Sequence, residues 1–273
     1  MRTIINKAIS KLHRLQLNER VSTSLSDNQI YPNFCLQASN DYRIFQNFRS
    51  NSIYTEILEH VTYKQGNDYL QQIQKSPQIL AEIDKFRDND KVGNPRVFTY
   101  DSVGKFSPST LRYIKVLSDL EDIFRNLNSL NICEIGVGYG GQCRVINSYY
   151  KPNTYTLVDI KPALMLAQRF LDNFIIESKL IYQTMNELDK FSKYDLLISN
   201  YAFTELPRVI QDVYLEKIIL NSQRGYITYN EITPVNFNSY KKSELLDIIP
   251  NAKVMEEVPL TYPNNCIIFW DIN

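Results

Sequence analysis

The spacing of apolar positions differs between the two halves of this chain. Between residues 40 and 90, apolar side chains recur three or four positions apart, as in Ile53, Ile57, Leu58 and Val61. This spacing lines one face of an α-helix, so helices are predicted for this half. We expect residues 1–103 to form a mainly helical cap or oligomerisation region and residues 104–273 to form an α/β domain.

A further helix is predicted just before the pattern changes. Residues 88–95 are rich in turn-forming residues, and Ser107 followed by Pro108 has the features of a helix N-terminus. This helix is predicted to run from Pro108 to about Asn126.

After Asn131, short apolar runs alternate with longer amphipathic stretches. The runs are residues 132–135, 154–158, 180–183, 195–199, 225–229, 252–258 and 266–270. Helices are predicted between the first five runs, at about 142–150, 163–174, 185–191 and 207–220, which indicates parallel strands joined by crossover helices. The last two runs are separated by about seven residues, too few for a crossover helix, so we expect them to pair antiparallel. The pattern predicts a doubly wound seven-stranded sheet whose last strand is antiparallel.

The charge balance and the cysteines narrow the classes of partner. The chain of 273 residues carries 30 basic and 30 acidic residues, so no net positive field favours nucleic acid. Its cysteines are Cys35, Cys133, Cys143 and Cys266. They are scattered and partly within apolar runs, which is typical of buried free thiols in a reducing cytoplasm. No Cys or His pair has metal-ligand spacing, so no transition-metal site is predicted, whereas magnesium held by carboxylates stays open.

The beginning of the chain bears on localisation. No run approaches the roughly 20 apolar residues needed to cross a bilayer, and the start lacks the apolar centre of a signal peptide. We therefore expect a cytoplasmic protein without a transmembrane segment. Residues 2–15 alternate isoleucine and leucine with lysine and arginine, the pattern of a basic amphipathic helix. Packing against its own domain, or against a second subunit in a homo-oligomer, is favoured over contact with an anionic membrane.

A glycine-rich motif lies where the first predicted strand meets the next helix. In CEIGVGYGG, residues 133–141, Gly136, Gly138 and Gly141 satisfy the spacing G-x-G-x-x-G, and Gly140 is an additional glycine. Glycine suits such a place because a tight turn that a ligand approaches closely leaves no room for Cβ. The following helix presents unpaired backbone N–H groups, which favour a phosphate or nucleotide ligand. A nucleotide site is predicted here.

Two acidic residues flank this motif. Asp159 ends the next strand about twenty residues on, where a carboxylate can accept both ribose hydroxyls, although it also suits the N-cap of the next helix. These features fit a dinucleotide as well as S-adenosylmethionine. Glu134 lies two positions before the first glycine, and in this the motif resembles that of the class I S-adenosylmethionine-dependent methyltransferases. The final antiparallel pair, residues 253–258 and 266–270, also resembles the last strands of that superfamily.

The resemblance spans residues 107–273 and implies a Rossmann-like fold with S-adenosylmethionine as cofactor. The cofactor-binding residues expected from it are Glu134, Gly136, Gly138, Gly140, Gly141, Asp159, Ile160, Asn186, Ser199, Asn200 and Arg112. For Glu134 the alternative is a purely structural carboxylate at a helix N-terminus. For Arg112, surface pairing or packing is the alternative, and binding of the acceptor is another.

The segment YDLLISNYAFTELP, residues 194–207, ends a predicted strand at the edge where α/β folds place their chemistry. Together with residues 57–61, 93–95 and 104–121, it resembles the sugar O-methyltransferases of bacterial surface-glycan pathways. That resemblance implies methyl transfer to a saccharide or a sugar-linked precursor of a capsule or O-antigen. Alternatives are transfer to a phosphoryl or other non-hydroxyl group, a nicotinamide-dependent oxidoreductase, and a non-enzymatic partner protein.

A sugar hydroxyl needs a base because it is a poor nucleophile until its proton is being removed. The first candidate is Glu205, just beyond the fourth strand, although it also suits a helix N-terminus. His60 has the ordinary pKa of a base for neutral pH, but a single histidine on an apolar helix face is more often structural. Tyr201 is the third candidate.

Overall fold

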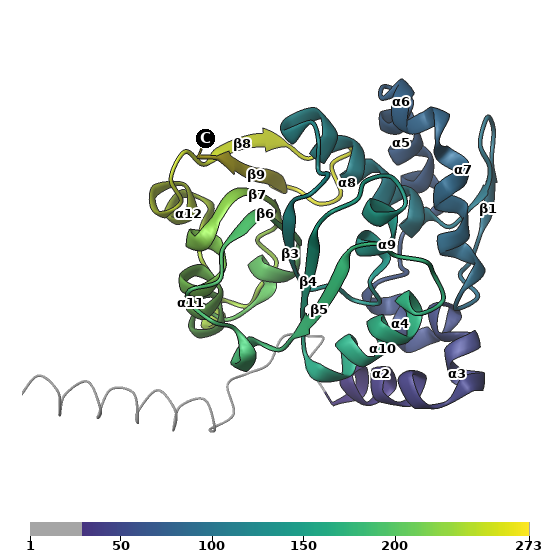
Figure 1. Ribbon diagram of the computed structural model, residues 1–273, viewed down its shortest axis with the longest axis horizontal. Coiled ribbons are helices and arrows are strands. Elements are labelled where there is room, and N and C mark those ends of the chain that lie inside the picture. Colours follow the sequence, from purple (N-terminus) through teal and green to yellow (C-terminus); the bar gives the residue numbers. More distant parts are fainter. Residues whose placement is uncertain (1–28, 273) are drawn as a thin grey trace, which may run out of the picture.

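The protein is built around a mostly parallel sheet of seven strands, and the computed structural model describes residues 29–272 (Figure 1). The strands are β3 (Asn131–Ile135), β4 (Thr154–Val158), β5 (Lys179–Gln183), β6 (Tyr194–Asn200), β7 (Ser222–Tyr229), β8 (Lys253–Glu256) and β9 (Cys266–Asp271). Their order across the sheet is β5-β4-β3-β6-β7-β9-β8, and β9 runs antiparallel to both of its neighbours. The predicted fold class and the antiparallel final pair are confirmed.

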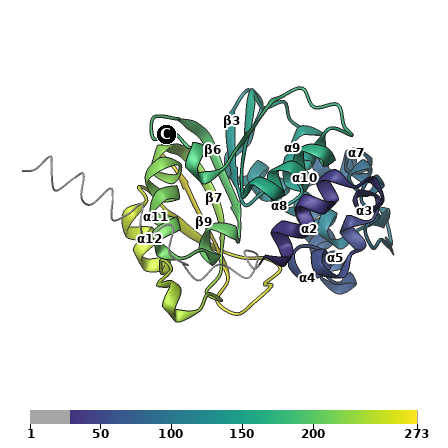
Figure 2. The same cartoon turned by 90° about the horizontal axis from the view of Figure 1, so that it is seen from below.

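Helices cover both faces of the sheet. One face carries α8 (Pro108–Phe124), α9 (Gly141–Asn147) and α10 (Lys161–Leu171), and the other carries α11 (Arg208–Lys217) and α12 (Lys242–Ile248) (Figures 1 and 2). Successive strand residues point to opposite faces. Ile132 therefore belongs to the core beneath α8 to α10, whereas Cys133 belongs to the core beneath α11 and α12.

The N-terminal half forms an outer layer on α8, α9 and α10 (Figure 2). Its helices are α2 (Ile30–Asn40), α3 (Tyr42–Gln46), α4 (Ser52–Ile57), α5 (Tyr63–Ile73), α6 (Pro77–Ala81) and α7 (Ile83–Phe86), with 3-10 turns η2 (Phe48–Ser50) and η3 (Arg87–Lys91). Helix α2 packs on α10 and α5 packs on α8. Phe48 from this half makes edge contacts with Tyr139 and Phe170 of the other half.

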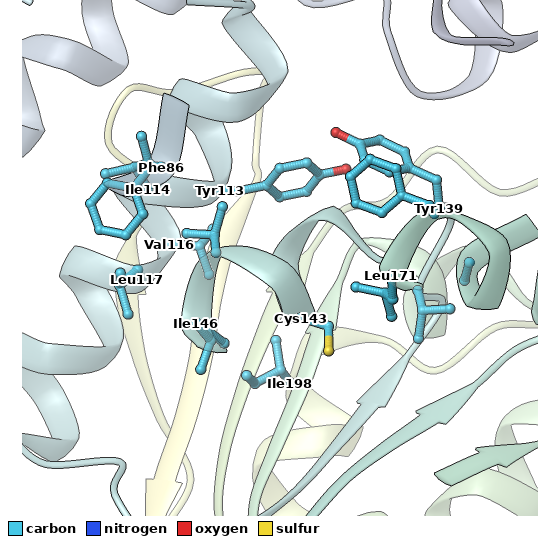
Figure 3. Packing of buried hydrophobic residues seen from close by; sticks show 14 of the residues in the cluster. Phe86, Tyr113, Ile114, Val116, Leu117, Tyr139, Cys143, Ile146, Leu171 and Ile198 are labelled. Carbon is cyan, nitrogen blue, oxygen red and sulfur yellow. The ribbon is translucent and has the colours of Figure 1, made fainter. Parts of the chain in front are cut away.

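Of the two apolar cores, the one beneath α8 to α10 joins the two halves of the chain. Figure 3 shows Phe86 of α7 among residues of α8, and Tyr113 of α8 beside Tyr139, whose ring centroid is 5.9 Å away. The outer layer and the sheet therefore share the side chains that stabilise them.

Two local elements differ from the predictions. The stretch expected to be helical at 185–191 contains only the 3-10 turn η4 (Met185–Glu187), because Leu188 is extended and the capping box formed by Thr184 and Glu187 closes a single turn. A hairpin of β1 (Phe98–Tyr100) and β2 (Gly104–Phe106) was not predicted. The remaining 3-10 turns are η5 (Ala202–Glu205), η6 (Ile219–Asn221) and η7 (Val235–Phe237).

Several sequence predictions concern accessibility. All four cysteines are buried free thiols, as predicted. Within residues 29–272, no helix is both long and apolar enough to span a bilayer. The predicted amphipathic helix at residues 2–15 lies outside the described part of the chain.

Candidate functional site

The glycine-rich motif forms a tight turn between β3 and α9. Gly136, Gly138 and Gly140 have φ angles of +78°, +54° and +85°, a region that favours glycine. A Cβ added to Gly136 would lie 2.0 Å from the Cβ of Ala202, which belongs to the turn after β6. The sequence therefore makes a turn that only glycines can form at these positions.

The motif's last two glycines have different structural roles. Gly140, counted as the additional glycine, is the left-handed N-cap of α9, whereas Gly141 is already its first helical residue. A Cβ on Gly141 would come within 2.5 Å of the Tyr113 ring. Gly141 is thus required for packing α8 against α9 rather than for the turn itself.

Asp159 connects the glycine turn to the end of the neighbouring strand. Its Oδ2 accepts a hydrogen bond from the Gly138 N–H at 3.2 Å, and its Oδ1 accepts one from Ile160 at 2.7 Å. The parallel pairing of β3 with β4 sets this distance, because Gly136 N–H donates to the Val158 carbonyl. The structure therefore brings together the glycine turn and Asp159, the two parts of the predicted nucleotide site.

Helix α2 also approaches Asp159, which the sequence did not indicate. Burial raises the pKa of Tyr31 well above its usual range, and the charges of Cys35 and Asp159 add to this effect. Tyr31 and Cys35 lie more than a hundred positions before Asp159 in the sequence, so no local motif could have indicated them. The predicted ligand-facing residue Asn186 is exposed on η4, after β5.

Glu134 lies beneath the turn rather than at its surface. Its side chain is buried, and its Oε2 accepts a hydrogen bond from the Tyr155 hydroxyl at 2.7 Å. Burial raises the pKa of Glu134 to about 8, and the Tyr155 hydrogen bond opposes this only in part. Strand alternation points this side chain into the core. Contact of Glu134 with a ligand stays a prediction.

The end of β6 reaches the same edge of the sheet. Ser199 is fully buried, donating to the Ile135 carbonyl and accepting from the Phe203 N–H. Its hydroxyl therefore connects β6 to β3 and to η5. The predicted role of Ser199 in cofactor binding stays a prediction. Asn200 and Tyr201 follow it, and both line a hollow beside α8.

A segment of the N-terminal half crosses this edge. The Leu58 side chain occupies the space above Gly138, 2.8 Å from where a Cβ would stand. Its carbonyl accepts a 3.4 Å hydrogen bond from Arg112. The next residue, Glu59, pairs with the fully buried guanidinium of Arg49 at 2.5 Å. We call Leu58–His60 the crossing segment.

Arg112 lies at the centre of the polar side chains at this edge. No carboxylate among residues 29–272 forms an ion pair with it. Burial lowers the pKa of His60, and Arg112 lowers it further. Burial raises the pKa of Glu205, which the Asn230 hydrogen bond and Arg112 oppose. Burial and Glu257 raise the pKa of Tyr201 well above its usual range, and Arg112 opposes this too.

The electrostatic influence of Arg112 therefore extends to all three predicted bases, which the fold gathers from distant positions in the sequence.

The hollow next to Arg112 has a volume of about 20 Å³, which accommodates a group the size of one water molecule. It is lined by Tyr69, Arg112, Asn200, Tyr201, Thr228 and Glu257, among others. Glu257 was not predicted, because 56 positions separate it from its hydrogen-bond partner Tyr201.

Comparisons with known proteins give similarities of fold. No protein-family model matches the sequence, and no curated protein is similar enough to count as a match. Among solved structures, protein 1320 of Thermoplasma acidophilum is 18% identical with a TM-score of 0.41, covering 59% of this chain and 87% of its own.

Two further structures are named methyltransferases or hold a cofactor product. Magnesium protoporphyrin IX methyltransferase from Synechocystis PCC 6803, with bound S-adenosylmethionine, is 14% identical with a TM-score of 0.43, covering 68% of this chain and 88% of its own. TrmK from M. capricolum, in complex with S-adenosylhomocysteine, is 15% identical with a TM-score of 0.41. The match covers 58% of this chain and 68% of TrmK. These similarities are too weak to assign an activity, so the class of this protein rests on its own sheet and site.

Proposed function

We propose that this protein is an S-adenosylmethionine-dependent methyltransferase. One observation carries the proposal: a turn of three left-handed glycines whose central N–H, from Gly138, donates to the carboxylate of Asp159. Such a turn lets a ligand approach the backbone closely, and a carboxylate at the end of the next strand suits ribose hydroxyls. When bound, the cofactor supplies a methyl group activated by a positively charged sulfur.

The residues at this edge fit the parts of that cofactor. Asp159 would accept hydrogen bonds from the ribose, and the glycine turn would lie against the adenosyl group. Arg112, which has no acidic partner among the described residues, would bind the carboxylate of the methionine portion through its planar guanidinium. The Leu58 side chain would move from Gly138 to admit the ligand.

For the acceptor, we propose a hydroxyl group of a saccharide or sugar-linked precursor of a bacterial surface glycan. The support is the sequence resemblance of residues 194–207 and a cleft edge that presents amide, hydroxyl and carboxylate groups. Alignment of the acceptor oxygen with the methyl group would supply much of the rate. Glu205, His60 and Tyr201 are the side chains at this edge that can accept the acceptor's proton.

Isothermal titration calorimetry with S-adenosylhomocysteine tests the cofactor. We expect binding that Asp159→Ala weakens about ten-fold or more, the scale of losing charge-assisted hydrogen bonds. Asp172→Ala is the matched control, because Asp172 is exposed at the end of α10, and it should leave the affinity unchanged. Equal affinities for the two variants would refute the site.

Fluorescence titration with NADH separates the proposal from a nicotinamide-dependent enzyme. Binding of NADH without binding of S-adenosylhomocysteine would contradict the methyltransferase proposal and favour a nicotinamide-dependent oxidoreductase. If the cofactor binds, release of S-adenosylhomocysteine on addition of nucleotide-sugars and glycan fragments identifies the acceptor. Turnover only with a phosphorylated fragment would favour the phosphoryl alternative.

A further inference from the structure

Tyr201 has a backbone conformation that a side chain other than glycine rarely adopts. Its φ and ψ angles are +66° and −38°, and its N–H donates to the Thr228 carbonyl at 3.1 Å. Such conformations persist only where the surrounding structure enforces them, and they concentrate at functional sites. Here the conformation directs the phenol from the end of β6 towards the segment before β9, where its hydroxyl meets Glu257.

Glu257 is a buried carboxylate that is held by hydrogen bonds and forms no ion pair within residues 29–272. It is 6% exposed. It accepts hydrogen bonds from the Tyr201 hydroxyl, from the Thr261 N–H at 2.9 Å and from the Thr261 hydroxyl at 2.7 Å. These hydrogen bonds hold the carboxylate in a fixed position beside the Tyr201 hydroxyl.

The hydrogen-bond direction leaves the lone pairs of the Tyr201 oxygen able to accept hydrogen bonds, and the Thr261 hydroxyl lies 3.2 Å from this oxygen. Because a carboxylate has no proton to give, the Tyr201 hydroxyl donates to Glu257. Both residues line the hollow of about 20 Å³, which suits a single hydroxyl or ammonium group. Glu205 and His60, the other two predicted bases, do not line it.

We propose that Tyr201 and Glu257 together take the proton from the acceptor hydroxyl, an inference that rests on the proposed methyl transfer. The acceptor's proton passes to the Tyr201 oxygen while the phenol's own proton passes to Glu257. The acceptor oxygen forms a bond to the methyl carbon, and the carbon–sulfur bond breaks with its electron pair left on sulfur. Glu257 then holds the proton until it is released to water.

Sinefungin provides a test that needs no acceptor. In this cofactor analogue, a carbon bearing an ammonium group replaces the methyl-bearing sulfur. Its nitrogen would therefore stand in the place of the transferred methyl group, with N–H donors directed towards the acceptor position beside Tyr201. We expect the wild-type protein to bind sinefungin more tightly than S-adenosylhomocysteine in calorimetry. Tyr201→Phe and Glu257→Gln should each lower this preference about ten-fold, the scale of a charge-assisted hydrogen bond, while leaving the affinity for S-adenosylhomocysteine unchanged.

The Tyr229–Glu231 pair is the matched control. Its hydroxyl–carboxylate distance is 2.9 Å, but neither residue lines the hollow. Tyr229→Phe and Glu231→Gln should keep the wild-type preference for sinefungin. If Glu257→Gln fails to fold, Tyr201→Phe decides alone, because it removes only a hydroxyl group.

Each other outcome has a distinct meaning. Absence of S-adenosylhomocysteine binding to the wild-type protein would overturn the methyltransferase proposal itself. Cofactor binding without a preference for sinefungin, or with a preference that survives Tyr201→Phe, would overturn only the proton-accepting pair. Loss of the preference in Glu257→Gln alone would indicate attraction by charge through space and would equally exclude transfer through Tyr201.

Discussion

At the scale of single residues, burial decides what the acidic side chains of the site can do. Glu134 and Asp159 flank the same glycine turn, but only Asp159 accepts a hydrogen bond from a backbone N–H of that turn, that of Gly138. Glu134 is enclosed in the core with Tyr155 as its hydrogen-bond partner. The sequence predicted a role for both carboxylates, but it could not distinguish their environments, because burial depends on which layer covers each face.

The raised pKa of Glu134 predicts a pH-dependent stability. Below 4.5, its ordinary pKa, both folded and unfolded chains hold the proton, and above about 8 neither does. Between these values only the folded chain retains it, so the free energy of unfolding should fall as pH rises. Urea unfolding of the wild-type protein and of Glu134→Gln across this range measures the difference. Parallel stability profiles would contradict a buried, protonated Glu134.

The assignment of Arg112 to the cofactor's carboxylate predicts selectivity between two ligands. Arg112→Gln should weaken S-adenosylhomocysteine binding about ten-fold or more, since a charge-assisted hydrogen-bond pair is lost. The same substitution should leave 5′-methylthioadenosine binding unchanged, because that ligand lacks the amino-acid portion. Calorimetry with both ligands measures this, and equal weakening of the two would instead indicate a structural role for Arg112.

At the scale of elements, buried polar contacts fix the crossing segment over the glycine turn. Arg49 is fully buried and pairs with Glu59 and Asp90, and its guanidinium also lies 4.7 Å from the centre of the Tyr139 ring. It thus joins η2, the crossing segment, η3 and the glycine turn. This side chain therefore adds a buried polar link to the apolar contacts that hold the outer layer next to the proposed cofactor site.

Removing this guanidinium should destabilise the fold strongly. Arg49→Met leaves Glu59 and Asp90 buried without their counter-ion, which costs about 3–5 kcal/mol in comparable buried pairs. Lys151→Met is the control: its pair with Glu177 is exposed, at 71% and 64% of the two side chains, and should contribute at most about 1 kcal/mol. Urea unfolding measures both, and similar small losses would contradict the role given to Arg49.

The elements most accurately predicted were those with a strong apolar rhythm. Strand β4 was predicted at its observed bounds, and α8 was predicted with its N-cap Ser107, because each signal lies within a few neighbouring residues. The hairpin of β1 and β2 was missed, since strands of three residues are too short to show a period. A helix was predicted at 185–191 from the alternation of strands and helices, but only a 3-10 turn forms at 185–187, because its capping box closes a single turn.

At the scale of the whole molecule, the site combines local and distant parts of the sequence. The glycine turn and Asp159 could be predicted, because strand, turn and helix follow one another along the chain. Tyr31 and Glu257 could not, since α2 and the segment before β9 reach the site only through tertiary packing. The sequence predicted His60 and Glu205 as separate candidate bases. The fold brings both close enough to Arg112 for its charge to lower their pKa values.

A crystal structure of the protein with saturating S-adenosylhomocysteine tests the central claim most directly. We expect the adenosyl group against the turn at 136–140, its ribose on Asp159 and its carboxylate on Arg112, with Leu58 displaced from Gly138. A turn still closed by Leu58 at saturating ligand, or the ligand bound elsewhere, would contradict the account.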